Sequence, residues 1–431
     1  MRGPFSSAGV LAPDGSLIRV IMSRFPTEVP RMTASVDVAT SPAGGHALPP
    51  HFASTDGAAP NRRGRRIGFM LGAAGVLVAA AVGVLQVTAN LGYDGARAEF
   101  DAAAASARDS ATTAQQELDT LTSVIDVADL LKTADTGVLT VPSSRDALTT
   151  ASTDAEEAAG PAEELLTEPL PSADSKPSAF WELFAASDQL AVDAGDLDEL
   201  AADLDAATPA MTAASTEVTE AGVALLRSAA DAAPAFESAH LSAKNDAVIA
   251  LRDAASRVPD TMLLDVTAVE SLVSMQDAAG QVVATEQAEL AEKAGPLQGD
   301  RLEIEAFARS LAPGVLLEFD WNQIVNNAGS NGSMGGLTTW WWDDPDRAAI
   351  ELSNSVAEQW PADRSKALIA HEVGHAISVK CEDMYDSSTQ DSIEKWATAW
   401  AISMGFTDDA NGVWAYGYPP QSYIDAAYGC R

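Results

Sequence analysis

An uninterrupted apolar segment at residues 67–87 restricts the folds open to this chain more than any other feature. None of its 21 residues carries a charge. As a helix that rises 1.5 Å per residue, a segment of this length can cross the hydrocarbon core of a bilayer, which is roughly 30 Å thick. The sequence therefore predicts a single transmembrane helix at residues 67–87.

Basic residues determine the predicted orientation of this helix. Arg62, Arg63, Arg65 and Arg66 precede the apolar segment, and positive charge stays on the cytoplasmic side of a membrane. We therefore expect a single-pass protein of the cell membrane with a cytoplasmic N-terminus and an extracytoplasmic C-terminal part. A cleaved signal peptide is the alternative because small residues follow at 87–89, although the apolar segment exceeds the 7–15 residues of a typical signal sequence.

The charge distribution agrees with this topology and limits the partners of the chain. Residues 1–66 contain 8 basic and 4 acidic residues, whereas the rest of the chain has 18 basic and 58 acidic residues, a net charge of −40. So acidic a surface argues against binding to nucleic acid or to anionic lipid. Residues 1–66 are rich in Pro, Gly, Ser and Ala without a sustained period, which predicts a disordered cytoplasmic segment.

Residues 88–299 are dominated by Ala, Asp and Glu, and they predict an acidic helical region because Ala and Glu are strong helix formers. Apolar residues recur there at the 3–4 spacing of a packed helix face, at Leu118, Leu121, Ile125, Ala128 and Leu131 and again at Met262, Val266, Val269 and Val273. We expect a bundle or a coiled-coil stalk of four or more long helices, with breaks at 133–144, at 160–177, near Pro209 and at 258–259. A homodimer through this region is an option, and His240 is expected to be an isolated surface residue.

The C-terminal part contains the pattern His371-Glu372-Val373-Gly374-His375, an HExxH motif in a run that is compatible with a helix. Positions i and i+4 of a helix lie on one face, so both imidazoles can bind a single Zn²⁺ at about 2.0–2.1 Å. Glu372 then lies beside the open coordination position, where it can take a proton from a water molecule. The motif predicts a catalytic zinc site with His371 and His375 as metal ligands and Glu372 as general base.

A third ligand decides the class of such a site. The metzincin pattern needs a glycine at position 378 and a histidine at position 381, but the chain has Ser378 and Cys381. Glu394, nineteen residues after the motif, begins a second run that reads as an amphipathic helix, and it is our candidate. Asp386, Asp391 and Cys381 are the alternatives.

An HExxH helix followed by a glutamate on the next helix resembles the gluzincin metallopeptidases, and over residues 300–431 the chain is closest to the single-domain minimal gluzincins. The resemblance implies an α+β zincin-like domain with a small antiparallel sheet, an active-site helix and a Glu-bearing helix, preceded by an all-α region. It also implies a Zn²⁺ cofactor held by His371, His375 and Glu394. The chain departs from the family at Thr398, where many gluzincins carry an Asp that supports the first histidine, and a hydroxyl is a weaker partner.

The activity that the resemblance implies is that of a zinc metallopeptidase. Such an enzyme would hydrolyse peptide bonds of an extracytoplasmic peptide or protein through a water activated by the metal, with Glu372 as general base. Two other functions stay open. One is a catalytically silent zincin-like domain on a helical adhesion or signalling ectodomain, and the other is a zinc amidase that acts on cell-wall peptide crosslinks.

The residues before the motif read as two strands. Residues 335–342 predict one strand, 343–346 a turn, and 349–353 a second strand. In a zincin an antiparallel edge strand lies over the active-site helix, where an extended substrate can add to it through main-chain hydrogen bonds. The tryptophans at 340–342 are expected either to pack in the core or to form a wall of the substrate groove, because neighbouring strand residues face opposite sides.

The last candidates follow the motif. The loop-like run 416–423 is rich in tyrosine, and Tyr418 or Tyr423 is our candidate to stabilise the oxyanion of the transition state. Cys381 and Cys430 are the two cysteines of the chain. Outside the cytoplasm we expect them to form a disulfide that ties the C-terminal tail to the end of the active-site helix.

Overall fold

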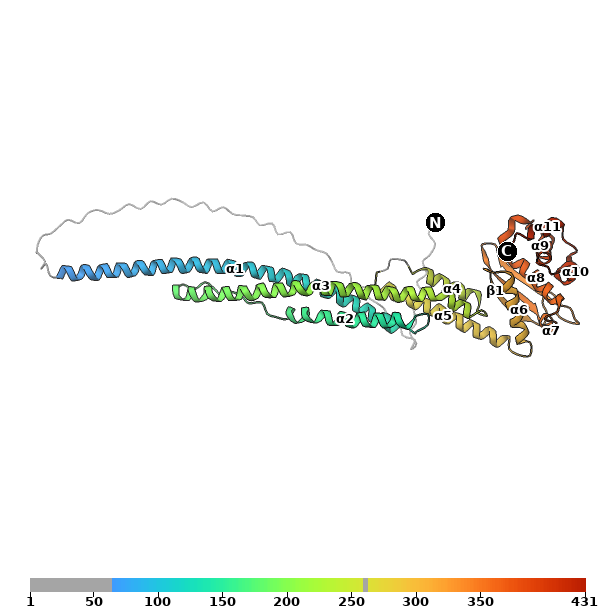
Figure 1. The fold of residues 1–431 in the computed structure, drawn as a ribbon, viewed down its shortest axis with the longest axis horizontal. Helices are drawn as coiled ribbons and strands as arrows, with labels where there is room; N and C mark the ends of the chain where they lie inside the picture. Colours follow the sequence, from blue (N-terminus) through green and yellow to red (C-terminus); the bar gives the residue numbers. More distant parts are fainter. Residues whose placement is uncertain (1–63, 259–262) are drawn as a thin grey trace, which may run out of the picture. The chain divides into compact units, whose positions relative to one another are not determined.

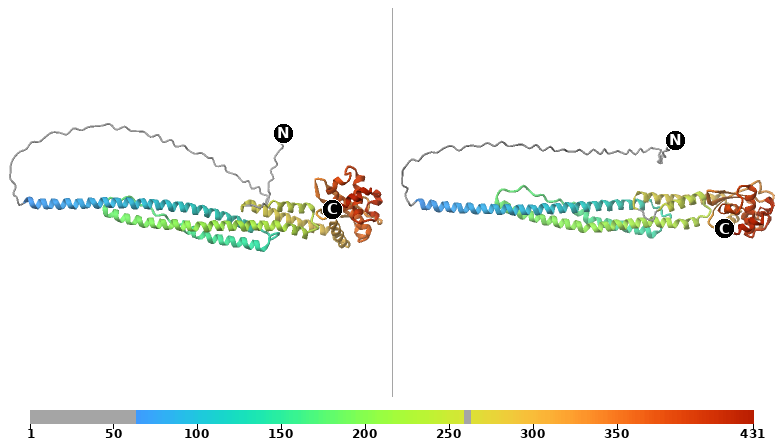
Figure 2. Two further views of the ribbon diagram at one scale, coloured as in Figure 1. Left: turned by 45° about the horizontal axis from the view of Figure 1, so that its top comes forward. Right: turned by 90° about the horizontal axis from the view of Figure 1, so that it is seen from above.

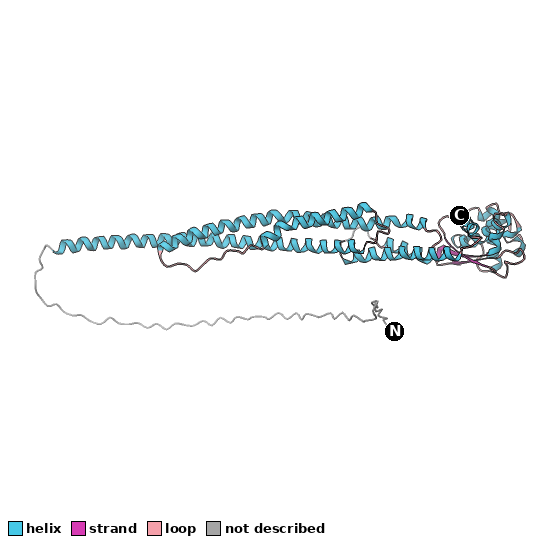
Figure 3. Cartoon of the chain, turned by 90° about the horizontal axis from the view of Figure 1, so that it is seen from below, coloured by secondary structure: helices cyan, strands magenta, loops and turns pink. Residues whose placement is uncertain are grey.

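The computed structural model describes residues 64–258 and 263–431. The chain divides into two units, Met1–Ala74 and Gly75–Arg431. The predicted disordered segment 1–66 therefore lies outside the described residues except for its last three, which belong to the first helix. Within the described residues the protein is mostly helical and contains one small sheet (Figure 3).

Five helices make up the N-terminal part of the described chain. They are α1 (Gly64–Ala134), α2 (Pro142–Leu166), α3 (Phe180–Ala239), α4 (Asn245–Ser256) and α5 (Val266–Glu292). Helices α1, α2 and α3 lie side by side in all three views (Figures 1 and 2). Their contacts are made largely by alanine and leucine, since small alanine side chains on long helices allow close approach while leucines fill the remaining space.

Helix α1 contains the apolar segment and continues well beyond it. Among the described residues it is the one helix long and apolar enough to cross a membrane. Large apolar side chains such as Val76, Leu77 and Val84 are 66–71% exposed along this stretch. The helix has no break at residue 87 and runs without interruption to Ala134.

The predicted helix breaks are confirmed in part. Helix α1 ends within the predicted break at 133–144, and a loop at 167–179 separates α2 from α3. The break near Pro209 is wrong, because α3 continues through both Pro209 and Pro234. A proline removes one main-chain hydrogen bond, but buried neighbours such as Leu204 and Met211 keep the helix packed on both sides. Residue 259 lies outside the described residues.

The two predicted helix faces have different outcomes. In the first, Leu121, Ala128 and Leu131 are fully buried, as expected. The second predicted face is wrong, because it is rotated about the axis of α5 from the face that is buried: Val266 is 58% exposed and Val273 is 38% exposed. Met262 lies outside the described residues. The buried face of α5 instead contains Ala268, Leu272, Met275, Ala279 and Val282. Two adjacent stripes of α5 both have the 3–4 spacing, and only packing distinguishes them.

His240 is not the isolated surface residue that the sequence suggested. Its Nδ1 lies 2.6 Å from Glu286 Oε2 of α5. Its ring also packs against Phe236 at 4.5 Å between centroids. The histidine therefore joins the end of α3 to α5.

The C-terminal part contains a three-stranded sheet and several short helices. Its elements are α6 (Gln298–Leu311), β1 (Leu316–Asn322), β2 (Gly336–Trp341), β3 (Asp344–Ser353), α7 (Asn354–Glu358), α8 (Asp363–Ser378), η1 (Val379–Met384), α9 (Gln390–Ser403), η2 (Asp409–Asn411), α10 (Val413–Tyr416) and α11 (Gln421–Ala427). The strand order is β1-β3-β2. Helices α8 and α9 pack against each other, and α8 also contacts β2 and β3.

The predicted antiparallel sheet is wrong in one respect, because the observed sheet is mixed. Strand β2 pairs with β3 in antiparallel fashion, but β1 pairs with the other side of β3 in parallel. The predicted turn at 343–346 is also misplaced, since β3 already begins at Asp344 and includes Pro345. Pairing with β1 starts only at Arg347, so the missing N–H of Pro345 breaks no hydrogen bond to that strand.

The core of the C-terminal part lies between the sheet and the helices. Ile350 and Leu352 of β3 are fully buried, as are Trp396 and Trp400 of α9. The expected disulfide between Cys381 and Cys430 is present, and it joins η1, directly after α8, to the C-terminal tail. This bond rules out the alternative in which Cys381 binds the metal.

Side chains of the helical region contact the sheet directly. Asn245, the first residue of α4, donates hydrogen bonds from its amide to the carbonyl oxygens of Leu316 (3.3 Å) and Ala348 (3.0 Å). Lys244 forms ion pairs with Glu289 of α5 (2.7 Å) and Glu318 of β1 (3.0 Å). The end of the helical region is thereby bound to the parallel pair of strands.

Candidate metal centre

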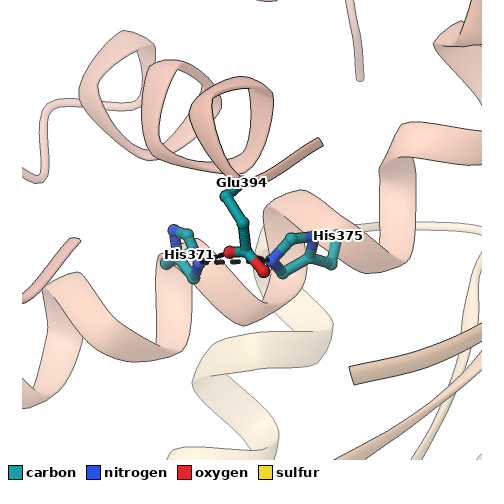
Figure 4. A group of neighbouring side chains, drawn as sticks. All are labelled: His371, His375 and Glu394. Atoms are coloured by element: carbon teal, nitrogen blue, oxygen red, sulfur yellow. Dashed lines mark hydrogen bonds and ion pairs between the residues drawn. The ribbon is translucent and has the colours of Figure 1, made fainter. Parts of the chain in front are cut away.

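Helices α8 and α9 bring the HExxH histidines and Glu394 together. His371 and His375 project from one face of α8, one turn apart, and Glu394 reaches between them from α9 (Figure 4). The two helices approach closely at Gly374, where an added Cβ would lie 2.9 Å from the backbone oxygen of Ala397. The glycine inside the motif therefore sets the distance at which the carboxylate meets the histidines.

The three side chains converge on one point. His371 Nε2 lies 3.2 Å from His375 Nε2, and Glu394 Oε2 lies 3.2 Å and 3.1 Å from these two nitrogens. All three residues are buried, with 5–8% of their surface exposed. Among the described residues, these three form the group of His, Cys, Asp and Glu side chains that could hold a metal ion.

The hydrogen bonds around the cluster fit a bound cation. His371 Nδ1 lies 2.9 Å from the carbonyl oxygen of Asn411 and must donate a hydrogen to it. If the ring were neutral, its Nε2 would present a lone pair to the carboxylate of Glu394. The contact is therefore favourable only with a proton or a cation between the two atoms. Ligand atoms of a tetrahedral ion at about 2.0–2.1 Å stand about 3.3 Å apart, close to the observed separations.

The charge of Glu394 suits the same role. Burial opposes ionisation of its carboxyl group, but hydrogen bonds with His371 and His375 outweigh burial, so the pKa of Glu394 is far below its ordinary value. Gln390 donates a 2.7 Å hydrogen bond to the other carboxylate oxygen, Oε1, which leaves Oε2 facing the histidines. Glu394 is therefore an oriented anion.

Glu372 lies beside the cluster without joining it. Its Oε2 accepts a 2.7 Å hydrogen bond from the hydroxyl of Thr338 on β2. Burial raises the pKa of Glu372, although the charge of His371 and the hydrogen bond from Thr338 act in the opposite direction. Gly336 makes room for this side chain, because an added Cβ there would collide with the Glu372 carboxylate.

The supporting partner of His371 differs from the one that the sequence suggested. Thr398 Oγ1 lies 3.4 Å from His371 Nδ1, whereas the Asn411 carbonyl lies at 2.9 Å. The backbone reaches this position through Gly412, whose φ of 103° suits glycine. A Cβ at Gly412 would also collide with both Thr398 and the His371 ring. A main-chain carbonyl forty residues away leaves no mark in the sequence, so local patterns do not reveal this partner.

Aromatic rings cover both histidines. Trp340 of β2 stacks on His375 with 5.3 Å between ring centroids and 3° between planes. Tyr416 of α10 stacks on His371 at 5.9 Å and 10°. Burial, together with the negative charges of Glu394 and Glu372, raises the pKa of Tyr416 to about 12, so this phenol keeps its proton at neutral pH.

The structure does not bring the predicted tyrosines to the cluster. Tyr418 is 66% exposed, and Tyr423 bonds to the Ser392 hydroxyl at 2.7 Å while its ring packs against Trp396. The phenol that the structure brings beside the histidines is instead Tyr416, the first residue of the same tyrosine-rich run.

The alternative acidic ligands also lie away from the cluster. Asp386 accepts hydrogen bonds from the main chain and hydroxyl of Ser388 in an exposed turn. Asp391 forms an exposed ion pair with Lys395 at 2.8 Å. Neither carboxylate belongs to the group that could hold a metal ion, so Glu394 is the acidic member of the cluster.

A cavity opens onto the cluster. Its volume is about 730 Å³, and its lining includes His371, Glu372, Tyr416, Gly336 and Trp414. Pockets of this size accommodate substrates or cofactors. The cavity therefore gives a ligand access to the general-base candidate and to one of the two histidines.

Comparisons with models of protein families, with characterised proteins and with solved structures find no match to this chain.

Proposed function

We propose that the C-terminal part of this chain is a zinc-dependent peptidase, anchored in the cell membrane by α1 and active on an extracytoplasmic peptide or protein. The observation that carries the proposal is the buried convergence of His371, His375 and Glu394 beside Glu372. Two imidazole nitrogens and one carboxylate oxygen are the ligand set of many catalytic zinc sites, which keep a fourth position open.

Glu372 is the group that moves protons in this proposal. A bound zinc ion would polarise the scissile carbonyl and lower the pKa of a water molecule in the cavity. The hydrogen bond from Thr338 holds the Glu372 carboxylate beside the cluster, where it can accept a proton from the attacking water. A raised pKa keeps that proton available for transfer to the departing amine.

Tyr416 is suited to assist at the oxyanion. Its phenol is protonated at neutral pH, as that of an ordinary tyrosine is, so it can donate a hydrogen bond to the carbonyl oxygen of the substrate. The ring already lies against His371 at the edge of the cavity.

Strand β2 offers a place for the main chain of a substrate. It is an edge strand, since it pairs with β3 on one side only. Thr338 faces α8 and is buried, whereas Leu337 is 47% exposed. An extended peptide that adds to this edge would run past Glu372 with its scissile bond near the cavity.

Digestion of a peptide library tests the proposed activity. We expect the purified full-length chain in detergent to cleave internal peptide bonds, to lose activity when 1,10-phenanthroline removes the metal, and to regain it when zinc is restored. Mass spectrometry of the products gives the cleaved bonds. Cleavage confined to cell-wall crosslink peptides would replace the peptidase by the amidase, and no cleavage of either substrate would support the silent domain.

A Tyr416→Phe variant should separate the role of the phenol from that of the metal site. We expect kcat to fall by about 10- to 100-fold, at or below the loss usually seen when one oxyanion donor is removed, while the metal content stays unchanged. Tyr418→Phe is the matched control, because Tyr418 is exposed and outside the cavity. Equal activity of the two variants would remove Tyr416 from the mechanism.

A further inference from the structure

The exposed apolar surface of α1 ends at a definite level. Large apolar side chains are exposed repeatedly from Val76 to Leu91, and the next such residue of α1 is Leu130. As a helix, the apolar segment 67–87 is about 31 Å long, which places Val87 at the boundary of a bilayer core roughly 30 Å thick. The exposed apolar side chains thus stop about one turn beyond this boundary.

The beginning of α3 lies at the same level. Gln86 donates a 3.0 Å hydrogen bond from its side-chain amide to the carbonyl oxygen of Ser178, two residues before α3 starts. Lys176 in the same loop pairs with Asp94 at 2.5 Å and lies over the ring of Tyr93 at 5.3 Å. The first turn of α3 is accordingly drawn beside α1 in every ribbon view (Figures 1 and 2).

Two aromatic side chains are exposed at this level. Trp181 is 64% exposed and Phe184 is 40% exposed, although Leu183 between them is fully buried against α1. They stand three residues apart and therefore occupy neighbouring positions on one face of α3. The ring contact of Trp181 is an edge-on contact with Phe180 at 5.0 Å, so the rest of the indole faces outward.

We propose that Trp181 and Phe184 insert into the interface of the bilayer that α1 spans. Indole rings accumulate at the level of the lipid headgroups, because one part of the ring is apolar and the N–H needs a polar partner. The register set by Gln86 and Ser178 brings Trp181 to that level. The inference depends on α1 as a membrane span and is independent of the peptidase proposal.

The residues around Trp181 and Phe184 indicate that their contact with the lipid headgroups does not depend on attraction between charges. Glu182 is exposed between the two aromatic residues, and Asp188 follows on the same helix. These carboxylates would repel anionic headgroups, in agreement with the strongly acidic extracytoplasmic part of the chain. The partner that fits is a zwitterionic lipid surface, such as phosphatidylcholine.

A second contact with the bilayer would orient the helical region. A single span leaves its tilt to be set by neighbouring helices and by interfacial anchors. With α1 in the membrane and the first turn of α3 on its surface, two points of contact would restrict rotation of the paired helices. The ectodomain would then hold a preferred direction relative to the membrane.

Bromine quenching of tryptophan fluorescence tests the inference. The full-length chain is reconstituted into phosphatidylcholine vesicles with or without bromine on the acyl chains near the headgroups. We expect brominated lipid to quench part of the wild-type emission and this quenching to be lost in Trp181→Phe. Trp414→Phe is the matched control, because Trp414 is 88% exposed in the C-terminal part, and it should leave the quenching unchanged.

A tryptophan within the span makes the outcomes distinct. In the Trp181→Phe background, Val82→Trp should restore strong quenching, because residue 82 lies inside the apolar segment. If brominated lipid quenches this double variant but quenches the wild type no more than it quenches Trp181→Phe, the interface contact is overturned and the membrane span is retained. If brominated lipid quenches neither the wild type nor the double variant, both the interface contact and the membrane span of α1 are overturned. If the emission of Trp181 changes with protein concentration and is the same with and without brominated lipid, the partner of Trp181 is a second copy of the chain.

Discussion

Glu372→Gln is expected to lower peptide hydrolysis by about 10²- to 10⁴-fold, the range that a general base contributes, and to leave the bound metal in place. Glutamine has nearly the same shape and can still accept the hydrogen bond from Thr338. It cannot take a proton from water at neutral pH. Because Glu372 is not among the three converging side chains, the affinity for zinc should change little.

The control for this prediction is Glu358→Gln, which removes the same charge from an exposed position at the end of α7. Its kcat/KM and metal content should match those of the wild type. Activity in Glu372→Gln within a few-fold of the wild type would contradict the role of the carboxylate as general base. Loss of zinc from this variant would instead indicate that Glu372 supports the metal site.

Glu394→Ala is expected to abolish stoichiometric zinc binding. The wild-type chain should contain about one zinc ion, as a site with three protein ligands requires. Removing the carboxylate leaves two histidine nitrogens 3.2 Å apart without the anion that faces both of them. Elemental analysis of the purified full-length chain after dialysis measures the effect, and hydrolysis should fall to background with the metal.

Asp391→Ala is the matched control, since Asp391 lies on the same helix three residues earlier and forms only an exposed ion pair with Lys395. We expect this variant to retain its zinc. Zinc retained without Glu394 would disprove the ligand assignment while leaving the enzyme proposal open. A wild-type chain without zinc would count against the peptidase and favour a structural or signalling role for the domain.

Several features of the site follow from local sequence patterns. His371 and His375 lie together because a helix repeats every 3.6 residues, whatever surrounds it. The neighbouring helix α9 could be read from its apolar spacing, and its candidate ligand Glu394 does reach the histidines. The disulfide was predictable as well, since the sequence predicts an extracytoplasmic location for both cysteines and two cysteines have one pairing available.

Other features depended on contacts between distant segments. The spacing of apolar residues in α5 fits two adjacent stripes, so it does not tell that Leu272 is buried and Val273 is exposed. The alternation in β3 predicts a strand but not the direction of its second neighbour, and β1 proved to be parallel. A proline predicts a break in a helix, yet packing on both sides carried α3 through Pro209.

The sequence by itself determined the apolar segment, the helical character of the acidic region and the spacing of the two histidines of the motif, because each depends on residues within a few turns of one another. Only the tertiary structure decided that the Asn411 carbonyl orients His371, that Tyr416 is the phenol beside the cluster, and that Thr338 holds Glu372. These contacts join residues 34 to 45 positions apart. Their geometry is set by how helices and strands pack, which no local pattern encodes.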